Sequence, residues 1–338
     1  MVGFPAAKPE PAEDKMIALL ARTACVLAIA LTATLPAAAQ DYPKKTIELV
    51  VPFVAGGTTD NIARLMAQRF SDSWGQTVVV NNRAGGGSTI GTNAVAKAPP
   101  DGHTLLVTTI GFAINAGLQK LPYDPIGDFT PVTELASLPL VLVVHASLPV
   151  TNLQEFIALA KSKAGGWDYA SSGTGTSPHL AAEMFKSMAG IELVHVPFKG
   201  NAEAMNSLMG GHVKIYFALV PAVLQHIKAG TLRAIAVTTE ERLPYLPDVS
   251  TIAELGFPGY EISSWQGVFA PAGTPKDVVV KINGELVRML NVPEVRRRIS
   301  QEGADPVGST PDAFANRVKN EITKWTKVIK TSGIQPSN

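Results

Sequence analysis

Two short stretches of small polar residues lie between an apolar run and a helical pattern, and both could bind an anion. The first contains Ala55, Gly56, Gly57 and Thr58, after the apolar stretch TIELVVPFV. Free backbone N–H groups at a helix start attract anions, and the helix dipole adds to the attraction. Glycines let a ligand approach those groups closely. A polar-capped turn is the alternative interpretation, because Asp60 can cap the first turn and its charge would compete with an anion.

The second stretch, YASSGTGTSPHLAAEMF at residues 169–185, has the same order of strand, small polar residues and helix. Ser177 is the expected N-cap, and Pro178 the expected first helical residue. The potential donors between them and the strand are Ser171, Ser172, Gly173, Thr174, Gly175 and Thr176. If the two helix starts face each other across a cleft, a carboxylate between them would receive hydrogen bonds from both sides.

Further candidates follow other predicted strands. Lys199, Gly200 and Asn201 end the strand in VPFKGNAEA, and Thr109 ends a strand before GFAIN. Phe53, immediately before the first loop, is a candidate ligand contact, although a core position is the favoured assignment for it as for Phe112 and Trp265. The run Ala84–Ser88 is either a third glycine-rich loop or a surface turn.

Catalytic and metal-binding patterns are weak. His179 and Glu183 share a helix face but lack a third metal ligand. Thr174 stands where a G-x-S-x-G nucleophile would be, and there is no P-loop or G-x-G-x-x-G match. We therefore predict a protein that is not an enzyme and that uses no metal or cofactor. A hydrolase that pairs Ser171 or Ser172 with His179 or His195 is the remaining catalytic alternative.

The bulk composition indicates an exported globular protein. The 338 residues are 46% hydrophobic with a formal charge of +1, which gives no sign of nucleic-acid binding. Lys15 and Arg22 precede the apolar run 24–35 and a small-residue cleavage site near Ala39, as in a secretory signal peptide. A membrane anchor is the alternative, and Met16 could replace Met1 as the start. The single cysteine, Cys25, lies in this leader, so a periplasmic chain without disulfides is expected.

Strand and helix patterns alternate along the rest of the chain, which favours α/β architecture with parallel strands. A strand is expected at Thr46–Phe53 and a helix at Asp60–Ser71, where the apolar residues have helical spacing. Residues 121–132 contain three prolines and look like a connection before a strand at Leu140–His145. We predict a signal peptide at 1–39, a first lobe at 40–142, a second lobe at 143–262 and a return to the first lobe at 263–338.

With these motifs in place, the sequence resembles the substrate-binding receptors of tripartite tricarboxylate transporters, the Bug or TctC-like family. The resemblance runs from about Tyr42 to Gly333 and includes YPKKTIELVVPFVAGGTTD, GQTVVVNNRAGGGSTIG, LPYDPIGDFTPV, YASSGTGTSPHL, VHVPFKG and PDVSTIAELGFPGY. It implies a two-lobed, type II-like periplasmic-binding-protein fold with mostly parallel sheets flanked by helices. It also implies that a carboxylate is held in a cleft between the lobes. The implied contacts are Ala55, Gly56, Gly57 and Thr58 in the first lobe, and Ser171, Gly173, Thr174 and His179 in the second.

Departures from the family pattern bear on the ligand. Lys214 and Ala218 occupy positions where relatives often carry acids that could meet an amine, and Phe198 replaces a common tyrosine. A dicarboxylate or an aromatic acid is therefore favoured over an amino acid. The resemblance implies a monomeric receptor that closes on a small organic acid and presents it to the membrane permease of a tripartite transporter. A sensor kinase is the alternative partner.

Overall fold

The structure is a computed structural model that describes residues 3–4, 42–301, 304–332 and 334. The chain divides into two compact units, Met1–Tyr42 and Pro43–Asn338, and the fold below is that of the second. The predicted leader, its cleavage site and Met16 lie outside the described residues. Within the described part of the chain, no helix is both long and apolar enough to cross a membrane.

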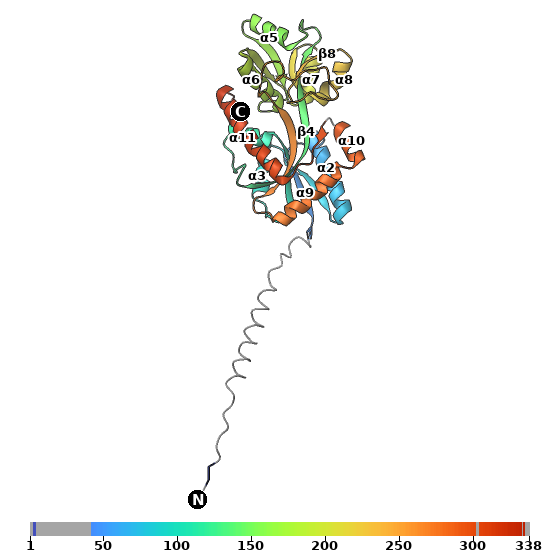
Figure 1. The fold of residues 1–338 in the computed structure, drawn as a ribbon, viewed down its shortest axis with the longest axis vertical. Coiled ribbons are helices and arrows are strands. Elements are labelled where there is room, and N and C mark those ends of the chain that lie inside the picture. The colour runs from blue at the N-terminus through green and yellow to red at the C-terminus, as the bar shows by residue number, and fades with distance from the viewer. Residues whose placement is uncertain (1–2, 5–41, 302–303, 333, 335–338) are drawn as a thin grey trace. The chain divides into compact units, whose positions relative to one another are not determined.

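Strands and helices alternate through most of the second unit (Figure 1). The strands are β1 (Ile47–Val51), β2 (Val78–Asn82), β3 (Thr104–Thr109), β4 (Phe129–His145), β5 (Trp167–Ser171), β6 (Leu193–Pro197), β7 (Ile215–Leu219), β8 (Leu232–Val237), β9 (Ser263–Pro271) and β10 (Asp305–Pro306). The helices are α2 (Thr58–Trp74), the short 3-10 helix η1 (Gly86–Ser88), α3 (Thr89–Ala96), α4 (Gly111–Leu118), α5 (Leu153–Ser162), α6 (Ser177–Ala189), α7 (Asn201–Met209), α8 (Val220–Lys228), α9 (Lys276–Leu290), α10 (Pro293–Gln301) and α11 (Pro311–Ser332).

One curled mixed sheet has the order β2-β1-β3-β9-β4-β7-β5-β6. β1 pairs in parallel with β2 and β3, and β5 pairs in parallel with β6 and β7. The central pairs β3–β9, β9–β4 and β4–β7 are antiparallel. The predicted parallel βαβ series therefore exist, but two antiparallel strands join them. The proposed lobe boundaries stay a prediction.

The strand β4 is much longer than expected. It covers 17 residues and starts at Phe129, inside the stretch predicted to be a connection. Proline is usually restricted to edges and irregular places in a sheet. Here Pro131 adjoins a register shift against β9, and Pro139 lies where β4 leaves β9 for β7. The missing N–H groups therefore fall where the ladder is already interrupted.

Because β4 pairs with β9 first and with β7 and β8 later, it divides the sheet into two halves. We call β1, β2, β3, β9, β10 and residues 129–139 of β4 the first half-sheet. The second half-sheet contains β5–β8 and residues 140–145 of β4. Figure 1 shows β4 running through both groups of helices.

The register along β4 turns the carboxyl ends of the parallel strands toward each other. Thr109, the last residue of β3, pairs with Gln266, which pairs with Ala136 of β4. Leu219, the last residue of β7, pairs with Leu140. β3 and β7 each run antiparallel to their central partner, so both end near the middle of β4. Ala136 and Leu140 are four residue steps apart along β4, which separates these two levels by about 13 Å.

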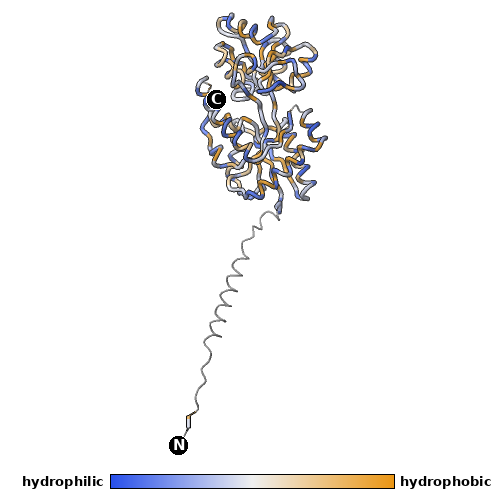
Figure 2. The backbone as a smooth tube through the Cα atoms, viewed as in Figure 1, coloured by the Kyte–Doolittle hydropathy of each residue, from blue (hydrophilic) through white to orange (hydrophobic). Residues whose placement is uncertain are grey.

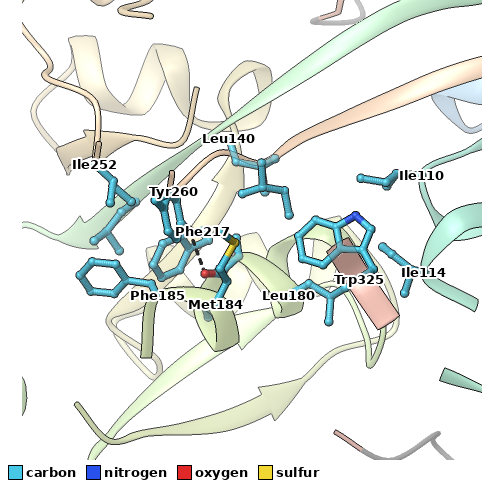
Figure 3. Close-up of a cluster of buried hydrophobic side chains, with 14 of the residues drawn as sticks. Ile110, Ile114, Leu140, Leu180, Met184, Phe185, Phe217, Ile252, Tyr260 and Trp325 are labelled. Carbon is cyan, nitrogen blue, oxygen red and sulfur yellow. Dashed lines mark hydrogen bonds between the residues drawn. The ribbon is translucent and has the colours of Figure 1, made fainter. Parts of the chain in front are cut away.

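The helices cover the sheet with amphipathic faces, and hydrophobic and hydrophilic residues alternate along them (Figure 2). In α2 the buried apolar residues Ile62, Met66 and Phe70 recur at helical spacing, as the sequence predicts. One hydrophobic cluster is continuous across both half-sheets. In it Trp325 of α11 lies with Ile110 and Ile114 of the first half and with Leu180 of α6 (Figure 3). Apolar packing therefore connects the halves along α11.

Candidate functional site

The first glycine loop leaves the start of α2 open. Gly57 is the N-cap, in an extended conformation, and it provides no side-chain cap. A Cβ added at Gly56 or Gly57 would meet no atom within 4 Å. Gly56 has φ of +87°, a conformation that favours glycine, whereas the φ of −83° at Gly57 suits any residue. No side chain of the loop therefore covers the backbone at this helix start, and anion binding there stays a prediction.

Asp60 faces the loop itself. Its Oδ2 accepts hydrogen bonds from Gly56 N at 2.8 Å and from Arg64 Nε at 2.9 Å. Its Oδ1 accepts one from Asn82 Nδ2 at 3.0 Å. Burial raises the pKa of Asp60, but hydrogen bonds from Arg64, Gly56 and Asn82 outweigh this and leave the pKa below its ordinary value. Asp60 therefore organises the loop, and Arg64 compensates the charge that would compete with an anion.

The second loop begins its helix one residue earlier than expected. Thr176, in an extended conformation, is the N-cap of α6, so Ser177 is already helical and Pro178 is the second helical residue. The assignment of Ser177 as cap was wrong because Thr176 fits the turn better. Its hydroxyl donates to the carbonyl of Gly173 at 2.7 Å. Pro178 still lies in the first turn, where its missing N–H costs no helical hydrogen bond.

Two histidines support this loop. Ser171 is fully buried, and its Oγ lies 2.6 Å from His195 Nε2 on β6. Gly173 N donates to the same Oγ at 3.1 Å. His179, in the first turn of α6, accepts a hydrogen bond at Nδ1 from Gly175 N at 3.0 Å. Ser171 and His179, predicted as ligand contacts, are thus both engaged in holding the loop.

Thr174 differs from its neighbours. It is half-buried, and among the described residues no hydrogen bond is recorded for either its N–H or its hydroxyl. The loop on both sides of it is fixed by Gly173 and Gly175. Thr174 is therefore the best placed of the predicted second-loop residues to donate to a ligand.

The third predicted group lies at the start of α7. Gly200 is its N-cap with φ of +100°, and a Cβ there would meet only open space. The Oδ1 atom of Asn201 accepts a hydrogen bond from Tyr216 on β7 at 2.7 Å, which leaves its Nδ2 group as a donor. Lys199 is exposed, and its backbone N–H donates to Glu203 Oε2 at 3.0 Å. Glu203 is therefore engaged with its own helix start.

The other predicted residues lie in different environments. Thr109 ends β3 at the shared edge, and its Oγ1 accepts from Gly111 N at 3.3 Å. Phe53 is partly buried beside the first loop. Ala218 is completely buried in β7 within an apolar cluster, so the structure gives it no surface for a ligand. Phe112 and Trp265 are buried, as predicted.

The second loop lies against the end of α4, the helix that follows β3 of the first half-sheet. A Cβ on Gly175 would lie 2.7 Å from Leu118 Cδ2, at the end of α4. Asn115 of α4 donates from Nδ2 to the carbonyl of Gly87 at 2.7 Å, so the third glycine loop is tied to the same helix. Residues 84–87 of the glycine-rich run are exposed and only Ser88 is buried, so the run is a surface turn that is tied to α4 at Gly87.

Sequence reasoning missed several supporting residues. Asn82 bonds both Asp60 and the carbonyl of Phe53, and Gln266 Nε2 donates to Thr59 Oγ1 at 3.3 Å. Tyr216 was also missed, although it orients Asn201. Asn82 gave a usable signal, because it is a polar residue at the end of an apolar strand. Gln266 and Tyr216 lie inside strands, and only the pairing of those strands reveals what they contact.

The hydrolase alternative has one matching distance, the 2.6 Å between Ser171 Oγ and His195 Nε2. However, Ser171 has no exposed surface, and within the described residues no carboxylate is recorded as hydrogen-bonded to His195. A serine nucleophile needs both access to substrate and an oriented base. Across the described residues, no group of three His, Cys, Asp or Glu side chains is arranged to hold a metal ion.

Comparison with known proteins adds a family and three solved structures. Residues 62–334 match the family described as the tripartite tricarboxylate transporter family receptor, TctC. The periplasmic binding protein BugD is 36% identical, with a TM-score of 0.73 and coverage of 88% of this chain and 100% of BugD.

Two of these structures contain ligands. An R. palustris protein solved with adipate is 40% identical, with a TM-score of 0.76 and coverage of 88% of this chain and 100% of that one. MatC from Rhodopseudomonas palustris, solved with bound malate, is 33% identical, with a TM-score of 0.72 and coverage of 85% and 100%. Both of these proteins were thus solved with a dicarboxylate.

Proposed function

The chain belongs to the tripartite tricarboxylate transporter receptor family, also called Bug or TctC-like, and we propose that it captures a small dicarboxylate between its two half-sheets. In this proposal the first loop binds from one side through the backbone at the start of α2, at Gly57 and Thr58. Thr174, Gly200 and Asn201 bind from the other. The receptor works as a periplasmic monomer, makes no covalent change to its ligand and delivers it to a membrane permease.

One observation carries the proposal: helix starts from both half-sheets lie at strand ends that point toward the middle of β4. Each helix start presents unpaired amide donors and a partial positive charge. The acidic side chains nearest to these loops are already engaged, since Asp60 pairs with Arg64 and Glu203 accepts from Lys199 N. The region therefore favours a negatively charged ligand.

The same arrangement bears on ligand class. A bound amino acid needs an acceptor for its ammonium group, preferably a carboxylate. Ala218 offers none, and Asp60 already accepts from Gly56, Arg64 and Asn82, so of these residues Glu203, whose Oε2 accepts from Lys199 N, is left to serve an ammonium group. The relatives solved with adipate and malate support a dicarboxylate. An aromatic monoacid is compatible with the same donors and is the second ligand class to test.

Contacts between the ligand and both halves of the protein would favour a closed conformation. A ligand that binds both halves stabilises the conformation in which they are closest. β4 and the segment that enters β9 at Ser263 cross between the halves, so a change of backbone twist near Pro139 and Ser263 would act as the hinge. We propose that the permease recognises the closed form.

Calorimetric titration of the mature protein tests this function. Adipate, malate, benzoate, glutamate and glucose form the panel, and the protein is first unfolded and refolded to remove retained ligand. We expect saturable binding of at least one dicarboxylate and weaker or no binding of glutamate and glucose. Binding of glucose without any acid would refute the ligand class. Release of product from ester or amide substrates, abolished by Ser171→Ala, would instead support the hydrolase.

A further inference from the structure

The second loop rests on a layer of aromatic and ionic side chains that the proposed function does not use. The rings of His179 and His195 stack with centroids 3.9 Å apart and planes 13° apart. His195 also stacks on Tyr169 of β5, with ring centroids 5.1 Å apart and planes 23° apart, and Tyr169 in turn lies 6.5 Å from His179. The Tyr169 hydroxyl donates to Glu183 Oε1 at 2.6 Å, and Lys186 Nζ bonds both oxygens of Glu183 at 2.8 and 3.0 Å.

We propose that His195 is a positioning residue for the carboxylate site, which rests on the proposed function. It fixes Ser171 and, through that hydroxyl, the amide of Gly173, so that Thr174 stays directed toward the ligand. It touches no ligand itself. Its stack with His179 couples this end of the loop to the other, where His179 holds Gly175.

Its hydrogen bond to Gly175 fixes the tautomer of His179. Its Nδ1 accepts from Gly175 N–H, so the neutral ring carries its proton on Nε2. Protonation of Nδ1 would place two N–H groups against each other and release Gly175. Burial, together with His195 and Lys186, lowers the pKa of His179 to about 3. The hydrogen bond to Gly175 therefore persists at neutral pH.

His195 is held neutral by the same surroundings. Burial lowers its pKa to about 4, with Glu183 acting in the opposite direction and Lys186 in the same one. Tyr169 and His179, the other titratable groups stacked with the His195 ring, add no positive charge at neutral pH. The Ser171 hydroxyl lies 2.6 Å from His195 Nε2 and 3.1 Å from the carbonyl of Gly173, to which it can donate its proton. In either case the Ser171 oxygen still accepts from Gly173 N–H, and a neutral His195 can serve as donor or acceptor to it according to its tautomer.

In this proposal Ser171 positions the loop and does not contact the ligand, so it can be fully buried. Gly173 has φ of +128°, so only a glycine adopts that bend easily, and a glycine-rich loop has many alternative conformations. Two imidazoles fix the loop at Ser171 and Gly175, on either side of Thr174. Ligand binding then loses less conformational entropy, because the loop is already ordered, which is the general benefit of a pre-organised site.

The test compares His195→Phe, His195→Gln, Ser171→Ala and the double variant His195→Phe/Ser171→Ala. Phenylalanine preserves the ring stack but removes the acceptor, whereas glutamine can restore an acceptor near the Nε2 position. Exposed His212 provides the control variant His212→Phe. Two measurements are made: amide hydrogen exchange of residues 171–176 without ligand, and the affinity for adipate and malate by calorimetry.

We expect His195→Phe to speed exchange of the Gly173 amide and to weaken dicarboxylate binding about tenfold, as for one lost hydrogen bond. His195→Gln should recover part of both effects. The double variant should be no weaker than the worse single variant, because both changes break one chain of contacts. His212→Phe should behave like the wild type.

Unchanged exchange at Gly173 in His195→Phe, or additive losses in the double variant, would overturn the inference. A loss of affinity that glutamine does not recover, with a general fall in melting temperature, would show a merely structural role and would also overturn it. Failure of the wild type to bind any dicarboxylate would instead refute the proposed function. In that case the exchange measurement still decides whether His195 fixes the loop.

Discussion

The carboxylate of Asp60 accepts a hydrogen bond from the backbone N–H of Gly56, four residues earlier, at 2.8 Å. This bond closes the first glycine loop on itself and consumes one amide donor. It also turns the negative charge inward, where Arg64 compensates it. An acidic residue in the proposed anion-binding loop therefore strengthens the loop, and its charge is paired with Arg64.

Replacing this carboxylate should loosen the first loop. We expect Asp60→Ala to lower the free energy of unfolding by about 1–3 kcal/mol at pH 7, since it leaves the donors of Gly56 and Asn82 without their acceptor. Urea unfolding measures the effect. Asp72→Ala, at an exposed position of the same helix, is the control and should change stability by less than about 0.5 kcal/mol.

The loss of stability in Asp60→Ala should depend on pH in a definite direction. The folded-state pKa of Asp60 is lowered, so its ionic contribution is present above the unfolded value near 4 and is lost as pH falls through the folded value. The difference in the free energy of unfolding between the wild type and Asp60→Ala should therefore become smaller below about pH 4. A gap that stays constant down to pH 2 would contradict this account of the Asp60 contacts.

Access to the first loop can be blocked without strain at one glycine. Gly57→Val should fold normally, because φ at Gly57 is −83° and its Cβ would meet open space. The valine side chain would shield the α2 amides, so dicarboxylate affinity should fall at least tenfold, about 1.4 kcal/mol. Calorimetry measures affinity and circular dichroism checks folding. Gly284→Ala in α9, remote in sequence from both loops, should leave the affinity intact; unchanged binding in Gly57→Val would argue against the first loop as ligand site.

The packing of α11 between the halves should dominate stability. Trp325 is fully buried and shares a cluster with Ile110, Ile114 and Leu180 (Figure 3). Trp325→Ala should destabilise the protein by about 3–5 kcal/mol through lost burial and the remaining cavity. The measurement is the midpoint of denaturant unfolding, with the exposed Val280→Ala as control. A loss under 1 kcal/mol would mean that α11 is not part of the cooperative core.

A buried acid on α11 should respond to pH in the opposite way to Asp60. Burial raises the pKa of Glu321, and Glu261 raises it further, against the opposing effects of Lys324, Trp325 and Arg317. The stability linked to its protonated form is present below the unfolded pKa, near 4.3, and is lost as pH rises through the higher folded value. At neutral pH the ionised side chain therefore costs stability.

Glu321→Gln should then stabilise the protein at pH 7, by about 1 kcal/mol, because glutamine keeps an acceptor for Trp325 Nε1 without the charge. The gain should shrink as pH is lowered toward 4.5, where the wild-type acid takes up its own proton. Thermal unfolding across this range measures it, with the exposed Glu192→Gln as control. A loss of stability at pH 7 would show that the charge is needed.

The sequence alone determined the local parts of this protein. Apolar periodicity located most strands and helices, and glycine-rich turns before helical patterns located the loops at Gly56 and Gly173, because these signals arise between near neighbours in the chain. It did not reveal the full length of β4. The prolines in that strand are tolerated only where the ladder changes register or partner.

Tertiary structure decided which way each polar side chain in the loops faces. Ser171 and Thr174 looked equivalent in the sequence, yet His195, 24 residues after Ser171, engages only the serine. In the sequence, the charge of Asp60 competes with that of an anionic ligand. In the structure, Asn82 and Arg64 both donate hydrogen bonds to its carboxylate. Such contacts depend on strands that pair across long sequence separations, and the hydrogen-bonding capacity of a side chain does not specify which distant partner will use it.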